Sequence, residues 1–260
     1  MSVLGQWLTP WDFSLVLLLA VAALALWYWR RRAARSPIAQ ASFWLGLIAL
    51  YAVQNTGFDY YAQHEFFMHR LQHLVLHHLA PFLLALGWPA NDRQAHGLTS
   101  HPLNAGWSVG RMLTHPVVSA FLFNALVLLW LIPAVHFPAM LDWRWYRAMN
   151  WSVLVSGLLF WLMALRGIAP GWPAVAGGMR IGLMIAVIPL QIVLGALIFF
   201  SPAELYPLYT LCGRAFADVD ALQDQQIGGL ILWIPGAMMS VLGIILVLQQ
   251  RLRRAPHVPI

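Results

Sequence analysis

The sequence contains little charge, no lysine and one cysteine. Only 9% of its 260 residues are charged, compared with roughly a quarter in soluble domains, which excludes an ordinary water-soluble protein. All fifteen basic residues are arginine, and the net charge is +6. Most of these arginines flank apolar runs, so the charge does not indicate nucleic-acid binding. The single Cys212 excludes an intramolecular disulfide and any CxxC metal motif.

The sequence is instead rich in long hydrophobic runs, and 61% of its residues are hydrophobic. A helix needs about 20 residues to cross a bilayer, and lipid offers no other partners for backbone N–H and C=O groups. We therefore expect an all-α polytopic membrane protein, a seven-transmembrane-helix bundle that forms one integral membrane domain over residues 1–260. The expected spans are Phe13–Trp29, Ala41–Gly57, Phe66–Gly87, Pro116–Val135, Trp151–Leu165, Arg180–Phe200 and Ile227–Leu248.

The distribution of charge predicts the orientation of this bundle. With the N-terminus outside, eleven of the fifteen arginines fall on the cytoplasmic side and eight of the nine acidic residues fall on the outer side. The opposite orientation would violate the positive-inside rule, so we expect N-out and C-in. The first apolar run follows Asp12 rather than a basic segment, so we expect it to be a retained span and not a signal peptide.

The stretch His64–Trp88 carries the most informative pattern. It is apolar enough to span a membrane, yet it contains five histidines, Glu65 and Arg70. A charged side chain at the bilayer centre costs about 2.5–3.5 kcal/mol, and ionisable residues in a span usually have a function. We expect Arg70 to pair with a nearby carboxylate or to extend to the interface. The candidate carboxylates are Asp59, Glu65 and Asp224.

Helical spacing arranges these residues in two stripes. With 100° per residue, one stripe contains His69, His73 and His77, and a neighbouring stripe contains His64, Met68 and Gln72. Two imidazoles at positions i and i+4 can bind one metal ion from a single helix face. The alternative is that these histidines hydrogen-bond to neighbouring helices or line a hydrated groove.

Copper suits this set of side chains better than zinc or calcium. Imidazole binds copper well, a thioether favours Cu(I), and no carboxylate-rich cage is present. We expect His69 and His73 as ligands, with His64 and Met68 as lesser candidates. The adjacent His77 and His78 point about 100° apart on a helix, so we do not expect both to face one ligand.

The remaining parts of the predicted site come from other segments. His136 is the candidate third ligand because it lies at the same outer level on a different element; an interfacial histidine is the alternative. Gln72 and Asp224 are expected to support the site by accepting hydrogen bonds from ring N–H groups. A possible second, inner group of histidines lies in the loop after the third span. It consists of His96, His101 and His115.

Four segments of the sequence resemble the CtaG-type cytochrome c oxidase assembly factors, the membrane family named for caa-type oxidases. The similar segments are His69–His73 (HRLQH) with Ala80–Pro89 (APFLLALGWP), Val135–Pro138 (VHFP), Ser156–Trp161 (SGLLFW) and Asp224–Trp233 (DQQIGGLILW). The resemblance covers roughly Phe58–Leu248, and its last segment is the most specific. Two positions depart from the family pattern: Arg70 stands where the family has methionine, and Asn150 stands where it has a histidine before the fifth helix.

The resemblance implies a protein of the bacterial plasma membrane that helps to assemble an active haem–copper oxidase. It implies copper, here expected as Cu(I), as the metal, and oxidase subunits and a copper donor protein as partners. We expect metal transfer at the outer face rather than enzymatic catalysis. The alternatives are a b-type haem electron carrier, disfavoured because the histidines cluster on one helix, and a scaffold for oxidase subunits that binds no metal.

Overall fold

The computed structural model describes residues 9, 13–31, 36–89, 109–168 and 174–254. Within these ranges the regular structure is entirely helical, which confirms the all-α class. His96 and His101 lie outside the described residues. The elements are α2 (Leu15–Trp29), α3 (Pro37–Asn55), α4 (Gly57–His64), α5 (Phe66–Leu74), η2 (Val75–Leu79), α6 (Ala80–Gly87), α8 (Val109–Leu113), α9 (Pro116–Leu131), α10 (Pro133–Leu141), α11 (Trp143–Trp161), η3 (Leu162–Arg166), α12 (Gly177–Phe199), α13 (Leu208–Cys212) and α14 (Ala221–Arg254).

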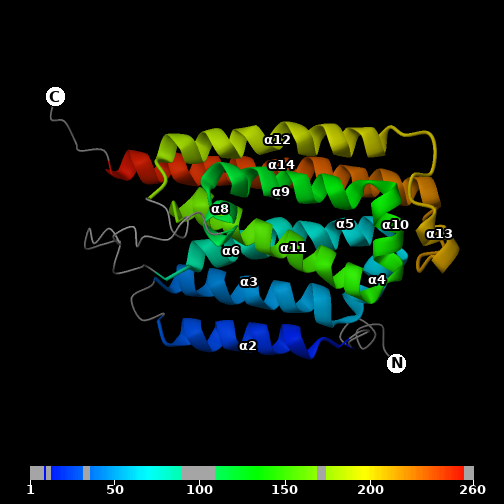
Figure 1. The fold of residues 1–260 in the computed structure, drawn as a ribbon, viewed down its shortest axis with the longest axis horizontal. Helices are drawn as coiled ribbons and strands as arrows, with labels where there is room; N and C mark the ends of the chain where they lie inside the picture. Colours follow the sequence, from blue (N-terminus) through cyan, green and yellow to red (C-terminus); the bar gives the residue numbers. More distant parts are fainter. Residues whose placement is uncertain (1–8, 10–12, 32–35, 90–108, 169–173, 255–260) are drawn as a thin grey trace.

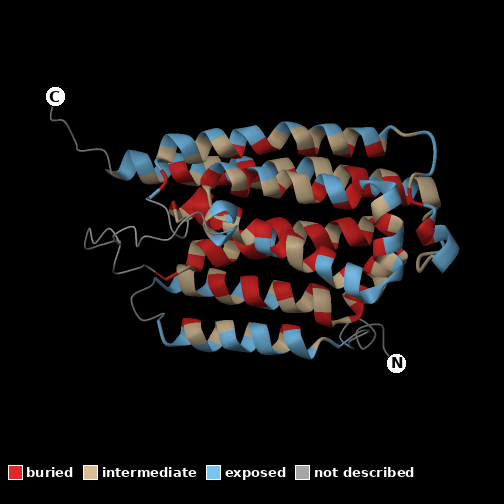
Figure 2. Cartoon of the chain, in the orientation of Figure 1, coloured by how far each residue is buried: buried red, intermediate tan, exposed pale blue. Residues whose placement is uncertain are grey.

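The long helices lie side by side along the long axis of the molecule (Figure 1). Helices α2 and α3 form one side, α12 and α14 form the other, and α5, α6 and α11 lie between them. The short helices α4, α10 and α13 gather at one end. Buried residues are concentrated on the central helices, whereas α2 and α12 expose much of their outer faces (Figure 2). These outer faces are apolar, as expected for surfaces that contact lipid.

Several helices are long and apolar enough to cross a membrane. Among the described residues, four helices meet this description by length and composition, and the pair α9 and α10, bent by 78°, makes a fifth if it is one span. The helix α2 is also apolar but has only 15 residues. The four helices that are long enough on their own are Pro37–Asn55, Trp143–Arg166, Gly177–Phe199 and Ala221–Leu252.

The predicted third span is divided in the structure. Helix α5 passes into a five-residue π-helical turn, η2, which continues as α6 to Gly87. The preceding helix α4 is a separate element, because Glu65 adopts an extended conformation with φ −138° and ψ 132°. The stripe predicted from His64 through Met68 to Gln72 is therefore interrupted at Glu65.

Local sequence explains where several of the helices begin. The Ser36 hydroxyl accepts a hydrogen bond from the Ala39 N–H at 3.3 Å, and proline occupies the first turn of α3. The Asp142 carboxylate accepts one from the Arg144 N–H at 2.8 Å, so α11 begins earlier than hydropathy alone predicted. Both are N-caps that satisfy free backbone donors.

Candidate metal centre

The start of α5 is fixed by a side chain from α14. The Asp224 carboxylate accepts hydrogen bonds from the backbone N–H groups of Phe66 at 2.9 Å and Phe67 at 2.7 Å. A carboxylate in this position satisfies free donors and interacts favourably with the helix dipole. The partners of Asp224 are thus the start of α5 and Arg214, rather than the histidine ring that the sequence suggested.

Arg214 forms ion pairs with two buried carboxylates at the N-terminal end of α5. Its Nη2 lies 2.6 Å from Glu65 Oε2 and 2.9 Å from Asp224 Oδ2. Glu65 Oε1 also accepts hydrogen bonds from the backbone N–H groups of Ala215 at 2.8 Å and Phe216 at 2.9 Å. We call Arg214, Glu65 and Asp224 the arginine clasp. Burial, reinforced by the nearby Asp224, raises the pKa of Glu65 although these hydrogen bonds and Arg214 oppose the shift.

Three of the predicted ligands converge one to two helical turns along α5 from the clasp. The ring centroids of His69 and His73 are 4.4 Å apart, and those of His69 and His136 are 5.2 Å apart. The three residues are 0%, 6% and 1% exposed. We call them the histidine cluster. Helix α5 supplies the first two from successive turns, and α10, which bends sharply away from α9, supplies the third.

The ring nitrogens of the cluster differ in their hydrogen bonding. Both nitrogens of His69 are buried, and neither makes a hydrogen bond of good geometry with the described residues, although the Ala62 backbone lies near the ring. His73 Nε2 lies 3.1 Å from Asn150 Oδ1. His136 is bonded through both nitrogens, with Nδ1 3.0 Å from the Trp130 carbonyl oxygen and Nε2 2.9 Å from the Tyr209 hydroxyl. Buried polar atoms without partners are rare in folded proteins. His69 is therefore the member of the cluster whose ring nitrogens are most available to bind a ligand.

These residues fit a metal ion only in part. Three neighbouring imidazoles are a suitable donor set for copper, and His69 has free ring nitrogens. Within the described ranges, however, no three or more His, Cys, Asp or Glu side chains are already grouped so that they could hold a metal ion. Binding at the cluster therefore requires His136 or His73 to exchange a present hydrogen bond for a bond to the metal.

Arg70 brings a positive charge to the cluster. The side chain is 3% exposed, and its guanidinium carbon lies 5.2 Å from the centre of the Phe66 ring. Its Nε and Nη2 atoms are buried without hydrogen-bond partners among the described residues. The prediction that Arg70 pairs with Asp59, Glu65 or Asp224 is wrong. Glu65 and Asp224 bind Arg214 instead, and Asp59 accepts hydrogen bonds from Gln72 and Tyr146.

Gln72 belongs to a polar network beside the cluster. Its Nε2 donates to the Val53 carbonyl oxygen and to Asp59 Oδ1, both at 2.8 Å. The Tyr146 hydroxyl lies 2.7 Å from Asp59 Oδ1 and 3.1 Å from Gln72 Oε1. These contacts tie α5 to α3, α4 and α11. Gln72 therefore positions the helix, and its recorded partners do not include a ring nitrogen of the cluster.

The two lesser candidates lie outside the ring contacts of the cluster. His64 ends α4, its Nδ1 is 2.7 Å from the Tyr60 carbonyl oxygen, and its ring packs on Tyr60 with centroids 4.1 Å apart. Met68 is buried in α5. Because it precedes His69 by one residue, it leaves the helix about 100° away from that side chain.

A pocket lined by residues of α10, α13 and the segment before α13 touches one member of the cluster, His136. Its volume is about 370 Å³, and it is lined in part by His136, Glu204 and Tyr206. Burial raises the pKa of Tyr206 to about 12, partly opposed by Arg70, so its hydroxyl is protonated at neutral pH. Sequence reasoning missed Tyr206 and Tyr209, since neither lies in one of the predicted spans, where helical spacing would have marked it.

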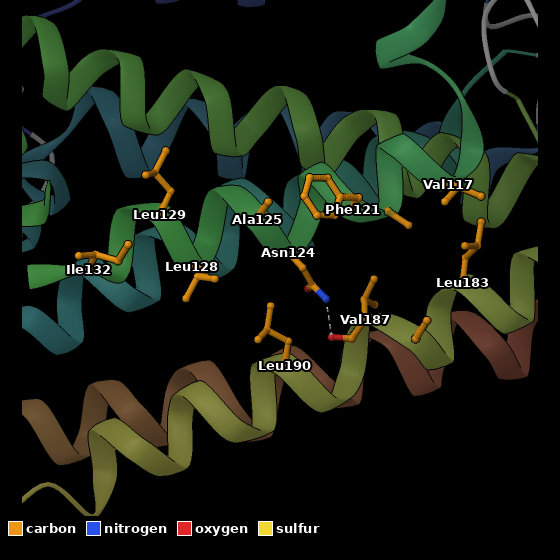
Figure 3. Close-up of a pocket in the computed structure, with 12 residues that line it drawn as sticks. Val117, Phe121, Asn124, Ala125, Leu128, Leu129, Ile132, Leu183, Val187 and Leu190 are labelled. Carbon is orange, nitrogen blue, oxygen red and sulfur yellow. Dashed lines mark hydrogen bonds between the residues drawn. The ribbon is translucent and has the colours of Figure 1, made fainter.

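A second, larger groove has different chemistry. It has a volume of about 540 Å³ and lies between α9 and α12 (Figure 3). Its lining is apolar except for Asn124, whose Nδ2 donates to the Val187 carbonyl oxygen at 3.2 Å. No histidine, cysteine, methionine or carboxylate lines it, so this groove is not a candidate metal site.

Comparison with known families gives one match that covers most of the chain. The family model described as cytochrome c oxidase caa3 assembly factor matches residues 20–254. This range contains every residue of the clasp and of the histidine cluster. No solved structure matches the chain.

Curated relatives of the chain come from mycobacteria. An uncharacterized protein of Mycobacterium leprae is 28% identical over 279 residues, which cover 98% of this chain and 41% of the relative. Uncharacterized proteins of Mycobacterium bovis and Mycobacterium tuberculosis are each 29% identical over 250 residues, which cover 87% of this chain and 37% of the relative. The chain therefore spans about two fifths of the length of these relatives.

Proposed function

Because this chain belongs to the cytochrome c oxidase caa3 assembly factor family, we propose that it holds copper during oxidase maturation and passes it toward the catalytic subunit. The observation that carries this proposal is His69. Among the described residues, its two buried ring nitrogens make no hydrogen bond of good geometry, and its ring contacts those of His73 and His136. A soft cation bound between these rings would give the free nitrogens the partner that the protein lacks.

The cargo that suits this set is Cu(I). The donors are neutral imidazoles, and imidazole is a good copper ligand. Copper binding through His136 Nε2 would displace the Tyr209 hydroxyl, and a hydrogen bond of this kind contributes about 0.5–1.5 kcal/mol. The nearby Arg70 guanidinium further opposes a cation. Both effects keep the affinity moderate, as a protein that releases its metal requires.

The topology proposed for this role has seven spans with the N-terminus outside and the C-terminus inside. The arginine distribution supports it, because eleven of fifteen arginines then lie on the cytoplasmic side. In this orientation the clasp, the cluster and the pocket beside His136 lie at the outer face of the bacterial plasma membrane. A copper donor protein would approach that pocket, and oxidase subunits would receive the metal there. In this proposal the chain is a metal-transfer protein and not an enzyme.

A copper titration tests the proposal. Purified protein in detergent is titrated anaerobically with Cu(I) against a chromophoric chelator that competes for the metal. We expect the wild type to bind copper and the His69→Ala/His73→Ala variant to lose binding at the cluster. His64→Ala is the matched control, since His64 lies on α4 and contacts Tyr60 instead of the cluster; its binding should equal that of the wild type.

Other outcomes would identify the alternatives. Equal copper in the wild type and the double variant would favour a scaffold that binds oxidase subunits without metal at this cluster. A strong Soret band with redox-sensitive visible peaks in the purified protein would indicate a b-type haem carrier.

A further inference from the structure

A small cavity lies beside the histidine cluster, among α5, η2, α9, α12 and α14. Its volume is about 20 Å³, which is room for one particle the size of a water molecule. The polar part of its lining consists of Arg70, His73, His77, His78 and Gln191, and no carboxylate lines it. Arg70 is the member of this set that is charged at every physiological pH. We call this space the arginine cavity.

Arg70 is a buried cation, and no described carboxylate forms an ion pair with it. The residue is 3% exposed, and its Nε and Nη2 atoms make no hydrogen bond among the described residues. The carboxylates of Glu65 and Asp224 bind Arg214, as described above. Buried charges in proteins are usually paired, and a charge within a membrane span is especially costly. The guanidinium therefore lacks the counter-ion that its surroundings require.

The side-chain amide of Gln191 brings further donors to the cavity. This residue is 1% exposed, and its Nε2 and Oε1 atoms make no hydrogen bond within the described part of the chain. Gly236 on α14 leaves room beside the amide. A Cβ atom at this position would lie 2.8 Å from Gln191 Oε1 and 3.8 Å from His78 Nε2. An alanine there would narrow the cavity without adding a charge or a hydrogen-bonding group.

The π-helical turn η2 places two adjacent histidines, His77 and His78, on the wall of the same cavity. A regular α-helix would direct them about 100° apart, and the expected divergence does not hold at this turn. Their ring centroids are 5.0 Å apart, and both rings contact Phe123. A neutral imidazole carries one N–H donor and no negative charge. The histidines therefore add no charge that would compete with an anion for Arg70.

We infer that the arginine cavity binds one monovalent anion of the size of a chloride ion. Arg70 supplies the opposite charge, and the unpartnered N–H groups of Arg70 and Gln191 supply hydrogen bonds, which are stronger when one partner is charged. Sulfate, phosphate and carboxylates carry several oxygen atoms and need more room than the cavity offers. A bound chloride neutralises the buried guanidinium, which a water molecule cannot do. This inference does not depend on copper binding at the histidine cluster.

A chloride titration of the full chain in detergent tests this inference. Protein purified in sodium gluconate is titrated with sodium chloride at constant ionic strength, and the heat of binding and the unfolding temperature are recorded. We expect one equivalent of chloride to bind and to raise the unfolding temperature in a saturable way, whereas the larger gluconate has no such effect. Arg70→Met should abolish both responses. Arg144→Met is the matched control, because Arg144 is exposed, and it should respond as the wild type does.

Gly236→Ala tests the place of binding without changing a charge. The added methyl group narrows the cavity beside Gln191, so the affinity for chloride should fall by at least about tenfold, and the larger bromide ion should lose more affinity than chloride. Gly182→Ala is the matched control, because a Cβ atom there meets no atom within 4 Å. Its affinity for both halides should equal that of the wild type.

Three outcomes would overturn the inference. Equal effects of chloride and gluconate on the wild type would show that the cavity holds water. A chloride response that persists in Arg70→Met, or an unchanged chloride affinity in Gly236→Ala, would place the ion elsewhere on the protein. If Arg70→Met does not fold, the comparison of Gly236→Ala with Gly182→Ala decides the question alone. None of these outcomes bears on the copper titration proposed above, so the two proposals fail separately.

Discussion

The arginine clasp holds the start of α5, and the histidine cluster takes two of its three members from the same helix, but the two groups treat their buried polar atoms in opposite ways. In the clasp, Arg214 binds two carboxylates, and those carboxylates accept four backbone N–H groups. In the cluster, His69 keeps buried nitrogens without a hydrogen bond of good geometry among the described residues, and the neighbouring Arg70 does the same. A buried polar network in which every group has a hydrogen-bond partner stabilises one structure. Buried groups without partners remain available to bind a ligand. This contrast supports a structural role for the clasp and the binding role proposed for the cluster.

Among the variants considered, removal of the clasp arginine Arg214 should cause the largest loss in the free energy of unfolding. Arg214→Met leaves the carboxylates of Glu65 and Asp224 buried without a counter-charge, and breaking a buried ion pair costs about 3–5 kcal/mol. Because Arg214 is 16% exposed, we expect the lower end of this range, measured by thermal and denaturant unfolding in detergent.

Arg144→Met is the control for the loss of one arginine, since Arg144 is exposed on α11. Adding Glu65→Gln to Arg214→Met should recover part of the lost stability. A loss below about 1 kcal/mol, the value typical of surface ion pairs, would show that the clasp does not stabilise the start of α5.

For Arg70, the arginine beside the histidine cluster, we expect that removal does not lower the free energy of unfolding. Arg70→Met removes a buried cation that has no carboxylate partner, and replacing a buried ion by a hydrophobic side chain is often neutral or stabilising. A like charge within about 10 Å opposes a bound cation by roughly 1.5–2 kcal/mol at an effective dielectric constant of 20. The variant should bind Cu(I) about tenfold more tightly in the chelator competition.

Arg144→Met again serves as the control, and its copper affinity should not change. An Arg70→Met protein that binds copper more weakly would mean that Arg70 organises the cluster instead of opposing its ligand. Unfolding of Arg70→Met at a temperature well below that of the wild type would indicate the same.

The contrast also explains how much the sequence could predict. Hydropathy and helical spacing identified the long helices, the all-α class and the convergence of His69 with His73, because these depend on local periodicity. The break at Glu65 could not be predicted, since its partners Arg214, Ala215 and Phe216 follow about 150 residues later. The same is true of Asp224, which was assigned to a histidine ring and instead caps α5.

The neighbouring residues His77 and His78 illustrate a second limit. A regular helix places His77 and His78 about 100° apart, and only the π-helical turn with its contacts to Phe123 and Trp161 directs both to one cavity. Nothing in the sequence VLHHL specifies that turn. Close packing contributes as well, because Gly157 on α11 has no room for a Cβ atom against the His77 carbonyl oxygen.

A smaller effect is expected at His136, the member of the cluster that is hydrogen-bonded through both ring nitrogens. Tyr209→Phe removes the hydroxyl 2.9 Å from His136 Nε2, which should lower the free energy of unfolding by about 1 kcal/mol. Because it frees a ring nitrogen, copper affinity should stay equal or rise. Tyr206→Phe is the matched control, as its hydroxyl donates to the Leu131 carbonyl oxygen and not to a ring nitrogen. Weaker copper binding in Tyr209→Phe alone would show that the hydroxyl orients His136 for the metal.

The smallest expected effect is a pH dependence confined to the clasp. Burial raises the pKa of Glu65 above its ordinary value of 4.5, so the folded state binds this proton more tightly than the unfolded state. The contribution of Glu65 to stability is then fully present below about pH 4.5 and declines as the pH rises through the higher pKa of the folded state. In Glu65→Gln this decline should disappear, so unfolding temperatures measured from pH 4.5 to about 7 should fall less steeply than those of the wild type. Asp218→Asn is the control, because Asp218 is an exposed carboxylate on the segment that carries Arg214, and it should follow the wild type. Parallel curves for all three proteins would mean that Arg214 and the backbone donors keep Glu65 ionised throughout, and that the clasp is insensitive to pH in this range.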